Sequence, residues 1–158
     1  MDFNHFKKNL LKLNKLPLGG LEAQFELAPK FREKYTEEFL EATNAKKAAV
    51  LALFYPNTQG DTCFLLTLRA NYSGVHASQI SFPGGKFDSA DDSLENTALR
   101  EAQEEVGICP EDVNIFKQMT NVFIPPSNFM VTPFLGLLDY TPTLTKNEEV
   151  EENIDVLL

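Results

Sequence analysis

Two apolar runs separated by a short polar turn constrain the fold of this chain most strongly. Residues 47–55 read KAAVLALFY, and residues 62–69 read TCFLLTLR. The six residues between them, PNTQGD, include proline, asparagine, glycine and aspartate, which favour tight turns. Two β-capable runs around such a turn predict a hairpin in a sheet that is buried on at least one face.

Hydrophobic periodicity and breaker residues predict the other elements. Phe3, Phe6, Leu10 and Leu13 recur at helical spacing until Pro17, Gly19 and Gly20 interrupt the pattern. A central helix is expected to end at Gly107, because glycine suits the left-handed position after a helix. The expected elements are helices at 3–14, 29–42 (with Phe31, Tyr35 and Phe39 on one side) and 93–106, and strands at 114–118, 119–124 and 130–138.

The order of these elements predicts the fold class. Helices come first, then the hairpin, the central helix and further strands, which suits an α/β (α+β) arrangement of a mixed sheet flanked by helices. The length of 158 residues suits one domain, 1–158, in which residues 1–45 form a helical N-terminal extension. No internal repeat, low-complexity tract or interdomain linker interrupts it.

Charge and composition exclude several classes of protein. The net charge is −9, from 23 acidic and 14 basic residues, so nucleic acid and anionic membranes are not expected partners. The longest apolar run has eight residues (48–55), too few for a membrane span, and the N-terminus lacks a secretory signal. Cys63 and Cys109 form no disulfide framework, which favours a reducing compartment. A cytoplasmic location is therefore expected.

The central helix carries three carboxylates that repel one another. Glu101, Glu104 and Glu105 lie at i, i+3 and i+4, within an arc of about 100°. Taken alone, such a cluster is most often a solvated acidic face. Here it follows the tight turn of Pro83, Gly84 and Gly85, where the backbone can approach a ligand closely, and further acids at Asp88, Asp91 and Asp92.

Clustered carboxylates without a histidine or cysteine ligand set favour a hard cation. Mg²⁺ or Mn²⁺ prefers oxygen ligands and completes its coordination with water and substrate phosphates. A cation would also relieve the repulsion between the three glutamates. The residues therefore indicate a metal platform for phosphoryl chemistry.

The segment resembles the Nudix box, in which a glycine, five residues, glutamate and seven residues precede Arg-Glu-x-x-Glu-Glu-x-Gly. Residues 100–108, REAQEEVGI, match its second half. Fourteen residues separate Gly85 from Arg100, one more than in the common pattern, and the early glutamate is replaced by an aspartate, which the spacing places at Asp92. The resemblance implies a Nudix-type α/β/α sandwich.

A second motif resembles the coenzyme A pyrophosphatase branch of that superfamily. Residues 65–70 (LLTLRA), His76, residues 79–81 (QIS) and residues 82–85 (FPGG) look like its signature, and the branch also has the longer box. Residues 127–133 and 147–150 resemble its later segments. A frequent arginine and a frequent glycine of the branch are Gly74 and Ser78 here. Relatives usually continue past Leu158 into a final helix, so either the C-terminus is truncated or the C-terminal wall of the site is reduced.

The resemblance implies roles for particular residues. Glu101, Glu104, Glu105 and the Gly85 carbonyl would hold Mg²⁺ or Mn²⁺, with Glu104, Glu101 and Arg100 as the catalytic group. The implied reaction cleaves the diphosphate of coenzyme A or its acyl derivatives into 4′-phosphopantetheine and adenosine 3′,5′-bisphosphate. The candidates for substrate binding are Arg69, His76 and Gly84, and those for the general base are Glu148 and Glu149.

Other interpretations stay open. The substrate could be another nucleoside diphosphate derivative, such as ADP-ribose or a dinucleotide; the chain could be a catalytically silent nucleotide sensor, or its acidic helix a protein-binding face. His76 could be structural, Arg69 could pair with an acid, and residues 148–152 could be a solvated strand end or a frayed tail. One ring among Phe123, Phe129 and Phe134 could stack on adenine, although most phenylalanines are core residues. The expected partner is a small molecule, and a homodimer could form.

Overall fold

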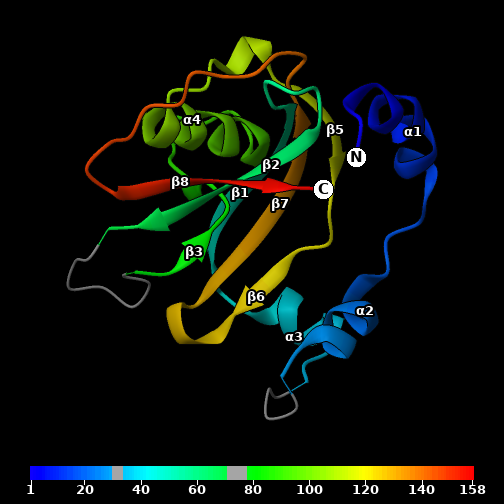
Figure 1. The fold of residues 1–158 in the computed structure, drawn as a ribbon. Helices are drawn as coiled ribbons and strands as arrows, with labels where there is room; N and C mark the ends of the chain where they lie inside the picture. Colours follow the sequence, from blue (N-terminus) through cyan, green and yellow to red (C-terminus); the bar gives the residue numbers. More distant parts are fainter. Residues whose placement is uncertain (30–33, 71–77) are drawn as a thin grey trace.

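The fold is a mixed β-sheet between helices, described here from a computed structural model for residues 1–29, 34–70 and 78–158 (Figure 1). The elements are α1 (Phe3–Lys15), α2 (Gly20–Leu27), α3 (Glu37–Ala42), β1 (Lys46–Pro56), β2 (Thr62–Arg69), β3 (Ile80–Ser81), β4 (Gly84–Lys86), α4 (Leu94–Val106), the 3₁₀ turns η1 (Pro110–Asp112) and η2 (Pro125–Ser127), β5 (Asn114–Gln118), β6 (Val122–Ile124), β7 (Phe129–Leu137) and β8 (Val150–Leu157).

The sheet is built on the predicted hairpin. β1 and β2 pair antiparallel, with Tyr55 opposite Cys63, around a turn in which the Asn57 side chain accepts hydrogen bonds from the backbone N–H groups of Gln59 and Asp61. The described strands form one eight-stranded sheet in the order β3-β2-β1-β7-β5, to which β4 adds on β1, β6 on β7 and β8 on β2. Only the β1–β7 pair is parallel among these strands. The sheet is therefore mixed, as expected.

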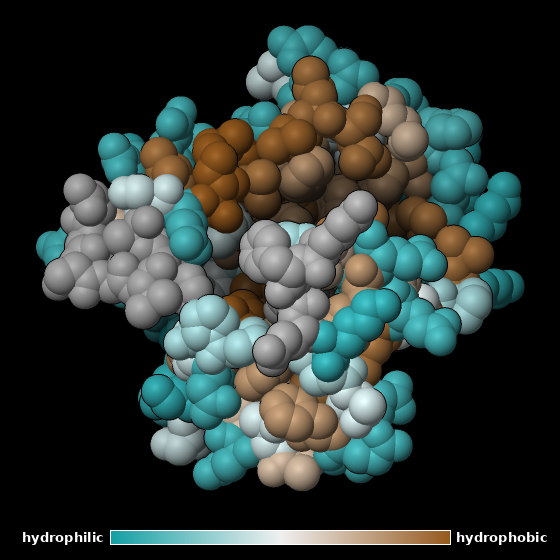
Figure 2. All heavy atoms as spheres, turned by 90° about the horizontal axis from the view of Figure 1, so that it is seen from below, coloured by the Kyte–Doolittle hydropathy of each residue, from teal (hydrophilic) through white to brown (hydrophobic). Residues whose placement is uncertain are grey.

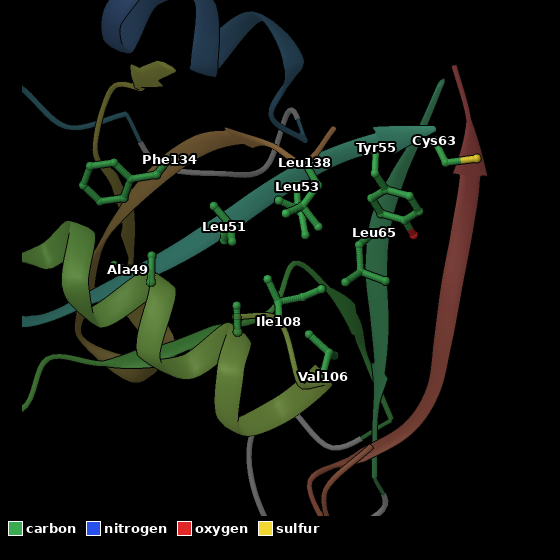
Figure 3. Packing of buried hydrophobic residues seen from close by; sticks show 12 residues of the cluster. Ala49, Leu51, Leu53, Tyr55, Cys63, Leu65, Val106, Ile108, Phe134 and Leu138 are labelled. Atoms are coloured by element: carbon green, nitrogen blue, oxygen red, sulfur yellow. The ribbon is translucent and has the colours of Figure 1, made fainter. Parts of the chain in front are cut away.

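The strand period of two places different residues on the two faces of β1. Leu51, Leu53 and Tyr55 point toward α4 and form the main core with its buried Ala98 and Val106 (Figure 3). On the opposite face Phe54 packs against Phe6 of α1, with ring centroids 5.1 Å apart. Helices thus cover both faces, which is the predicted α/β/α sandwich.

The second half of the N-terminal extension differs from its prediction. Within the described part of the helix predicted for residues 29–42, helix α3 begins at Glu37, because Thr36 accepts a hydrogen bond from Phe39 N and acts as its N-cap. Residues 34–36 are not helical, and residues 30–33, with the predicted Phe31, lie outside the described residues. Helix α2 forms where only a break was expected.

Smaller differences occur in the sheet. The strand predicted for residues 119–124 begins only at Val122, and the two short strands β3 and β4 were not foreseen. The acidic segment near the C-terminus is not a frayed tail, because residues 150–157 run antiparallel along β2.

Over the described residues, no helix combines the length and the apolar character needed to cross a bilayer. Figure 2 shows hydrophobic residues gathered mainly in the upper part of one face, with hydrophilic residues along the edges of the view.

Candidate active site

Two adjacent glycines on β4 set the floor of the site. Gly84 and Gly85 pair with Val50 and Ala49 of β1. A Cβ on Gly84 would lie 2.3 Å from the carbonyl oxygen of Ala49, and a Cβ on Gly85 would lie 2.5 Å from the carboxylate of Glu101. Gly84 therefore lets two strands pair, whereas Gly85 makes room for an acidic side chain.

Helix α4 presents the three glutamates at different depths. The Ser93 hydroxyl caps its first turn by accepting from Asn96 N, and Gly107, at φ 76°, ends it. Ala98, Ala102 and Val106 are buried against the sheet and fix the rotation of the helix. The side chain of Glu105 is therefore 3% exposed, that of Glu101 16% and that of Glu104 55%.

Glu105 joins α4 to the glycine turn. Its Oε2 accepts a 3.0 Å hydrogen bond from Gly84 N, and its Oε1 lies 3.7 Å from Nη1 of Arg69. Burial raises the pKa of Glu105 to about 7, although the Gly84 hydrogen bond and the Arg69 charge oppose that rise. Burial also raises the pKa of Glu101, which the charge of Arg100 opposes. Both carboxylates thus lie where a further positive charge would stabilise them.

Arg100 pairs with Asp91 on one side of its guanidinium and with Glu101 and Glu104 on the other. Its Nε and Nη2 donate to the two oxygens of Asp91, at 2.9 and 3.1 Å. Its Nη1 lies 3.0 Å from Glu101 Oε1 and 3.1 Å from Glu104 Oε2. The Arg100 hydrogen bonds lower the pKa of Asp91 to about 2. Arg100 therefore orients both glutamates.

The partner of Arg100 corrects one sequence-based assignment. Spacing counted back from Arg100 placed the early acid of the box at Asp92, but the structure shows Asp91 in the ion pair. The five residues 86–90 that follow Gly85 are followed directly by Asp91, as the box pattern requires, so the extra residue of the box lies between the acid and the arginine. The turn at 88–91, closed by Asp91 N donating to Asp88 O, directs the Asp91 side chain back toward Arg100 and Thr97.

Glu149 reaches the site from the far end of the chain. Asn147 N donates to Glu105 O, and Ala70 N donates to Glu149 O, so the segment before β8 is tied to both α4 and the end of β2. Oε2 of Glu149 lies 3.4 Å from Nη2 of Arg69. Glu149 lines a cavity at this site, whereas Glu148 is exposed and does not line it.

These residues surround a cavity of about 700 Å³ that has a polar and an apolar side. Arg69, Lys86, Glu101 and Glu149 contribute charged groups. The apolar side consists of Phe82, which lies between β3 and β4, and of residues from β1, β6 and β7: Ala48, Val50, Val122, Ile124, Phe129 and Val131. Such a cavity can hold a ligand that is charged at one end and has a flat or apolar group at the other.

The structure sorts the candidates that the sequence suggested. Those lining the cavity are Arg69, Gly84, Gly85, Glu101 and Glu149; Glu105 is buried beside Gly84, while Glu104, Arg100 and Glu148 do not line it. His76 and Gly74 lie outside the described residues. Phe134 is a core residue, Phe123 is buried, and Phe129 is the ring of these three that lines the cavity. Lys86 and the apolar wall were missed, since no local pattern distinguishes them.

The donor set of the site suits a divalent metal. The Glu101 carboxylate occupies the place that a Cβ on Gly85 would fill, the Glu105 carboxylate lies beside Gly84, and carboxylate oxygens are ligands that such a cation prefers. Across residues 1–29, 34–70 and 78–158, no group of three or more Asp, Glu, His or Cys side chains is arranged to hold a metal ion. The carboxylates are instead paired with Arg69 and Arg100.

Comparison with known families agrees with this geometry. The family model of the NUDIX domain matches residues 45–155, which include the glycine turn, α4 and most of β8. The chain belongs to the Nudix family. The N-terminal helices α1, α2 and α3 precede the Nudix match.

Similar sequences carry the same family name. The chain is 41% identical over 108 residues to an uncharacterized Nudix hydrolase NudL of Yersinia enterocolitica, covering 68% of this chain and 54% of that protein. It is 39% identical over 129 residues to NudL of Salmonella newport, covering 79% and 60%. The Nudix chain thus spans about half to three fifths of the length of these relatives.

Solved structures show the same fold. A Nudix hydrolase from M. smegmatis, RenU, superposes with a TM-score of 0.60 at 26% identity, covering 72% of this chain and 71% of that one. The NUDIX domain of Shewanella oneidensis NrtR, solved in complex with ADP ribose, superposes with a TM-score of 0.56 at 21% identity, covering 77% and 82%. The second likeness concerns the fold alone.

Proposed function

We propose that this protein is a metal-dependent Nudix pyrophosphohydrolase that cleaves the diphosphate of coenzyme A or its acyl derivatives, giving 4′-phosphopantetheine and adenosine 3′,5′-bisphosphate. The observation that carries the proposal is one cavity that joins Glu101, Arg69 and Lys86 to an apolar wall. Membership of the Nudix family supports the reaction. The LLTLRA and FPGG segments, which resemble the coenzyme A branch, support the substrate.

Metal binding is assigned to the acids of α4. Glu101, Glu105 and Glu104, with the Gly85 carbonyl, would hold Mg²⁺ or Mn²⁺. When bound, the metal neutralises diphosphate oxygens and makes a coordinated water more acidic. Glu101 and Glu105 are favoured over Glu104, because the first lines the cavity, the second is buried beside the glycine turn, and Glu104 is exposed against Arg100. Arg100 keeps Glu101 in place.

Substrate binding is assigned to the cavity wall. A guanidinium fork matches phosphate oxygens in a bidentate way, which suits Arg69, and the Lys86 charge can assist it. His76 and the Gly84 backbone remain proposed substrate contacts. The ring of Phe129 is the proposed platform for a base, because it faces the cavity from β7.

The proton of the attacking water needs an acceptor. We assign this role to Glu149 rather than Glu148, because Glu149 lines the cavity and is linked through Asn147 to the backbone of Glu105. Its side chain is largely exposed, and a carboxylate within reach of the attacking water can serve as a general base.

Product analysis tests the proposal. Coenzyme A, ADP-ribose, NADH and a nucleoside triphosphate would each be incubated with Mg²⁺ or Mn²⁺ and analysed by liquid chromatography and mass spectrometry. We expect coenzyme A to yield the two named products. Glu101→Gln should lower the rate at least about a hundredfold, because it removes a proposed metal ligand. Glu95→Gln, the same change at an exposed position of α4, should leave the rate near wild type.

The other outcomes separate the alternatives. If ADP-ribose or NADH is cleaved and coenzyme A is not, the proposed Nudix chemistry stands and the proposed substrate is rejected. Gly74 and Ser78, where the chain differs from the coenzyme A branch, would then be the residues to examine. Ser78 adopts φ 56°, a left-handed conformation that favours glycine. Tight nucleotide binding without any cleavage would instead identify a silent sensor.

A further inference from the structure

The two arginines of the site hold their carboxylates in different ways. Arg100 donates two hydrogen bonds, of 2.9 and 3.1 Å, to the two oxygens of Asp91, close to the geometry of a bidentate, charge-assisted pair. Arg69 spans two acids at longer range, with Nη1 3.7 Å from Glu105 and Nη2 3.4 Å from Glu149. The contacts of Arg100 with Asp91 are therefore short and paired, whereas the contacts of Arg69 with Glu105 and Glu149 are longer and divided between two acids.

We propose that Arg69 is the resident counter-cation of the metal site, which a divalent cation displaces from Glu105 and Glu149 when it binds. The displaced guanidinium then faces the cavity, where it can bind a phosphate of the substrate. This inference rests on the proposed function, because it assumes that the acids near Gly85 bind a metal.

Charge and burial explain why a counter-cation is needed. Glu105 is 3% exposed, and its carboxylate would be costly to bury without a positive charge nearby. Glu101 and Glu149 also act on Glu105 through their charges, so three acids share this region. Arg69 supplies the positive charge that faces Glu105 from β2, and the backbone N–H of Gly84 supplies the hydrogen bond.

The position of Arg69 makes displacement feasible. Its backbone is held in β2, where Arg69 N donates to Gln79 O, so only the side chain needs to move. The same side chain lines the cavity on the side of Lys86 and Glu101. A guanidinium that leaves Glu105 therefore stays within the substrate site, and its planar fork suits a phosphate.

Exchange of this kind couples metal and substrate. Because the cation and Arg69 compete for Glu105, metal binding frees the arginine, and a substrate phosphate that captures the arginine favours metal binding in return. Removing Arg69 should thus have opposite effects on the two ligands: the metal should bind more tightly, and the substrate less tightly.

The test measures binding of Mn²⁺ alone, without substrate, by titration calorimetry. We expect Arg69→Gln to bind Mn²⁺ about tenfold more tightly than the wild type. Lys86→Gln removes a charge of the same sign from the cavity wall, and Lys86 forms no ion pair with the described residues. It should change the affinity by less than about threefold, since exposed charges are strongly screened.

Arg69→Lys extends the test if the glutamine variant folds poorly. An ammonium cannot span both acids as a guanidinium does, so its Mn²⁺ affinity should lie between those of the wild type and Arg69→Gln. Unchanged or weaker Mn²⁺ binding in both variants, with normal binding by the wild type, would overturn the inference alone. Failure of the wild type to bind Mn²⁺ would overturn the proposed metal dependence and this inference with it.

Discussion

At the scale of single residues, adjacent glycines carry different tasks. The space beside Gly84 is filled by backbone, the Ala49 carbonyl oxygen and the Val50 Cα. The space beside Gly85 is filled by the end of the Glu101 side chain. Backbone in a paired strand cannot give way cheaply, whereas a carboxylate can rotate. Identical substitutions at the two positions should therefore separate folding from metal binding.

Replacing each glycine by alanine tests this difference. Gly84→Ala should lower the free energy of unfolding by about 3 kcal/mol or more, because its Cβ meets the β1 backbone. Gly85→Ala should stay within about 1 kcal/mol of the wild type, and its Mn²⁺ affinity should fall about tenfold or more as Glu101 is pushed aside. Urea denaturation and Mn²⁺ titration of both variants give the two readouts. Equal loss of stability in both would contradict the distinction.

At the scale of elements, α4 is attached to its preceding turn by Asp91. That carboxylate accepts from Arg100 at two atoms and from Thr97 Oγ1, and it is nearly buried. The turn, the helix and the two glutamates that Arg100 orients thus form one connected unit. Its strength should depend on the charge of Asp91.

Asp91→Asn should lower the free energy of unfolding by about 1–3 kcal/mol near pH 6. The hydrogen bonds from Arg100 lower the pKa of Asp91 from 3.8 to about 2 in the folded protein. Its contribution is therefore complete above about pH 4 and is lost as the pH falls through about 2. The gap between wild type and variant, measured by urea denaturation at several pH values, should shrink below pH 4.

Asp92→Asn is the matched control for this experiment, since Asp92 is the neighbouring acid that spacing had favoured. It should change the free energy of unfolding by no more than about 0.5 kcal/mol at any pH. If Asp92→Asn lowers the free energy of unfolding more than Asp91→Asn does, Arg100 pairs with Asp92 in solution and not with Asp91.

At the scale of the molecule, one face of the sheet serves two purposes. On β1, Phe54 is covered by α1, while Val50 and Ala48 on the same face line the cavity. On β7, Leu137 packs with α1, while Phe129 and Val131 line the cavity. Helix α1 thus closes one end of this face, and the other end stays available to a ligand.

Phe6→Ala tests how strongly α1 is docked. Phe6 is buried with Phe3 and Leu137, so its loss should lower the free energy of unfolding by about 3–5 kcal/mol. Leu11→Ala, at a position of the same helix that is 74% exposed, should change it by no more than about 0.5 kcal/mol. Urea denaturation measures both. Similar small effects from the two changes would mean that α1 does not pack on the sheet in solution.

The sequence by itself determined the parts of this protein that depend on local chemistry. Apolar runs around a turn predicted β1 and β2, and Gly107 predicted the end of α4, because strand periods and helix end signals are properties of neighbouring residues. The same reasoning failed at residues 34–36, where Thr36 starts a new helix and Tyr35 instead packs its ring against Phe25 and Phe123.

Only the tertiary structure decided how the carboxylates of the site differ. Glu101, Glu104 and Glu105 look alike in the sequence, and their depths follow from the rotation of α4 on the sheet. Glu149 meets Arg69 across 80 residues because β8 pairs with β2, and Asp91 rather than Asp92 meets Arg100 because of the turn before α4. Strand pairing and helix packing bring together residues that are far apart in the chain. A pattern of neighbouring residues cannot show which distant residues will meet.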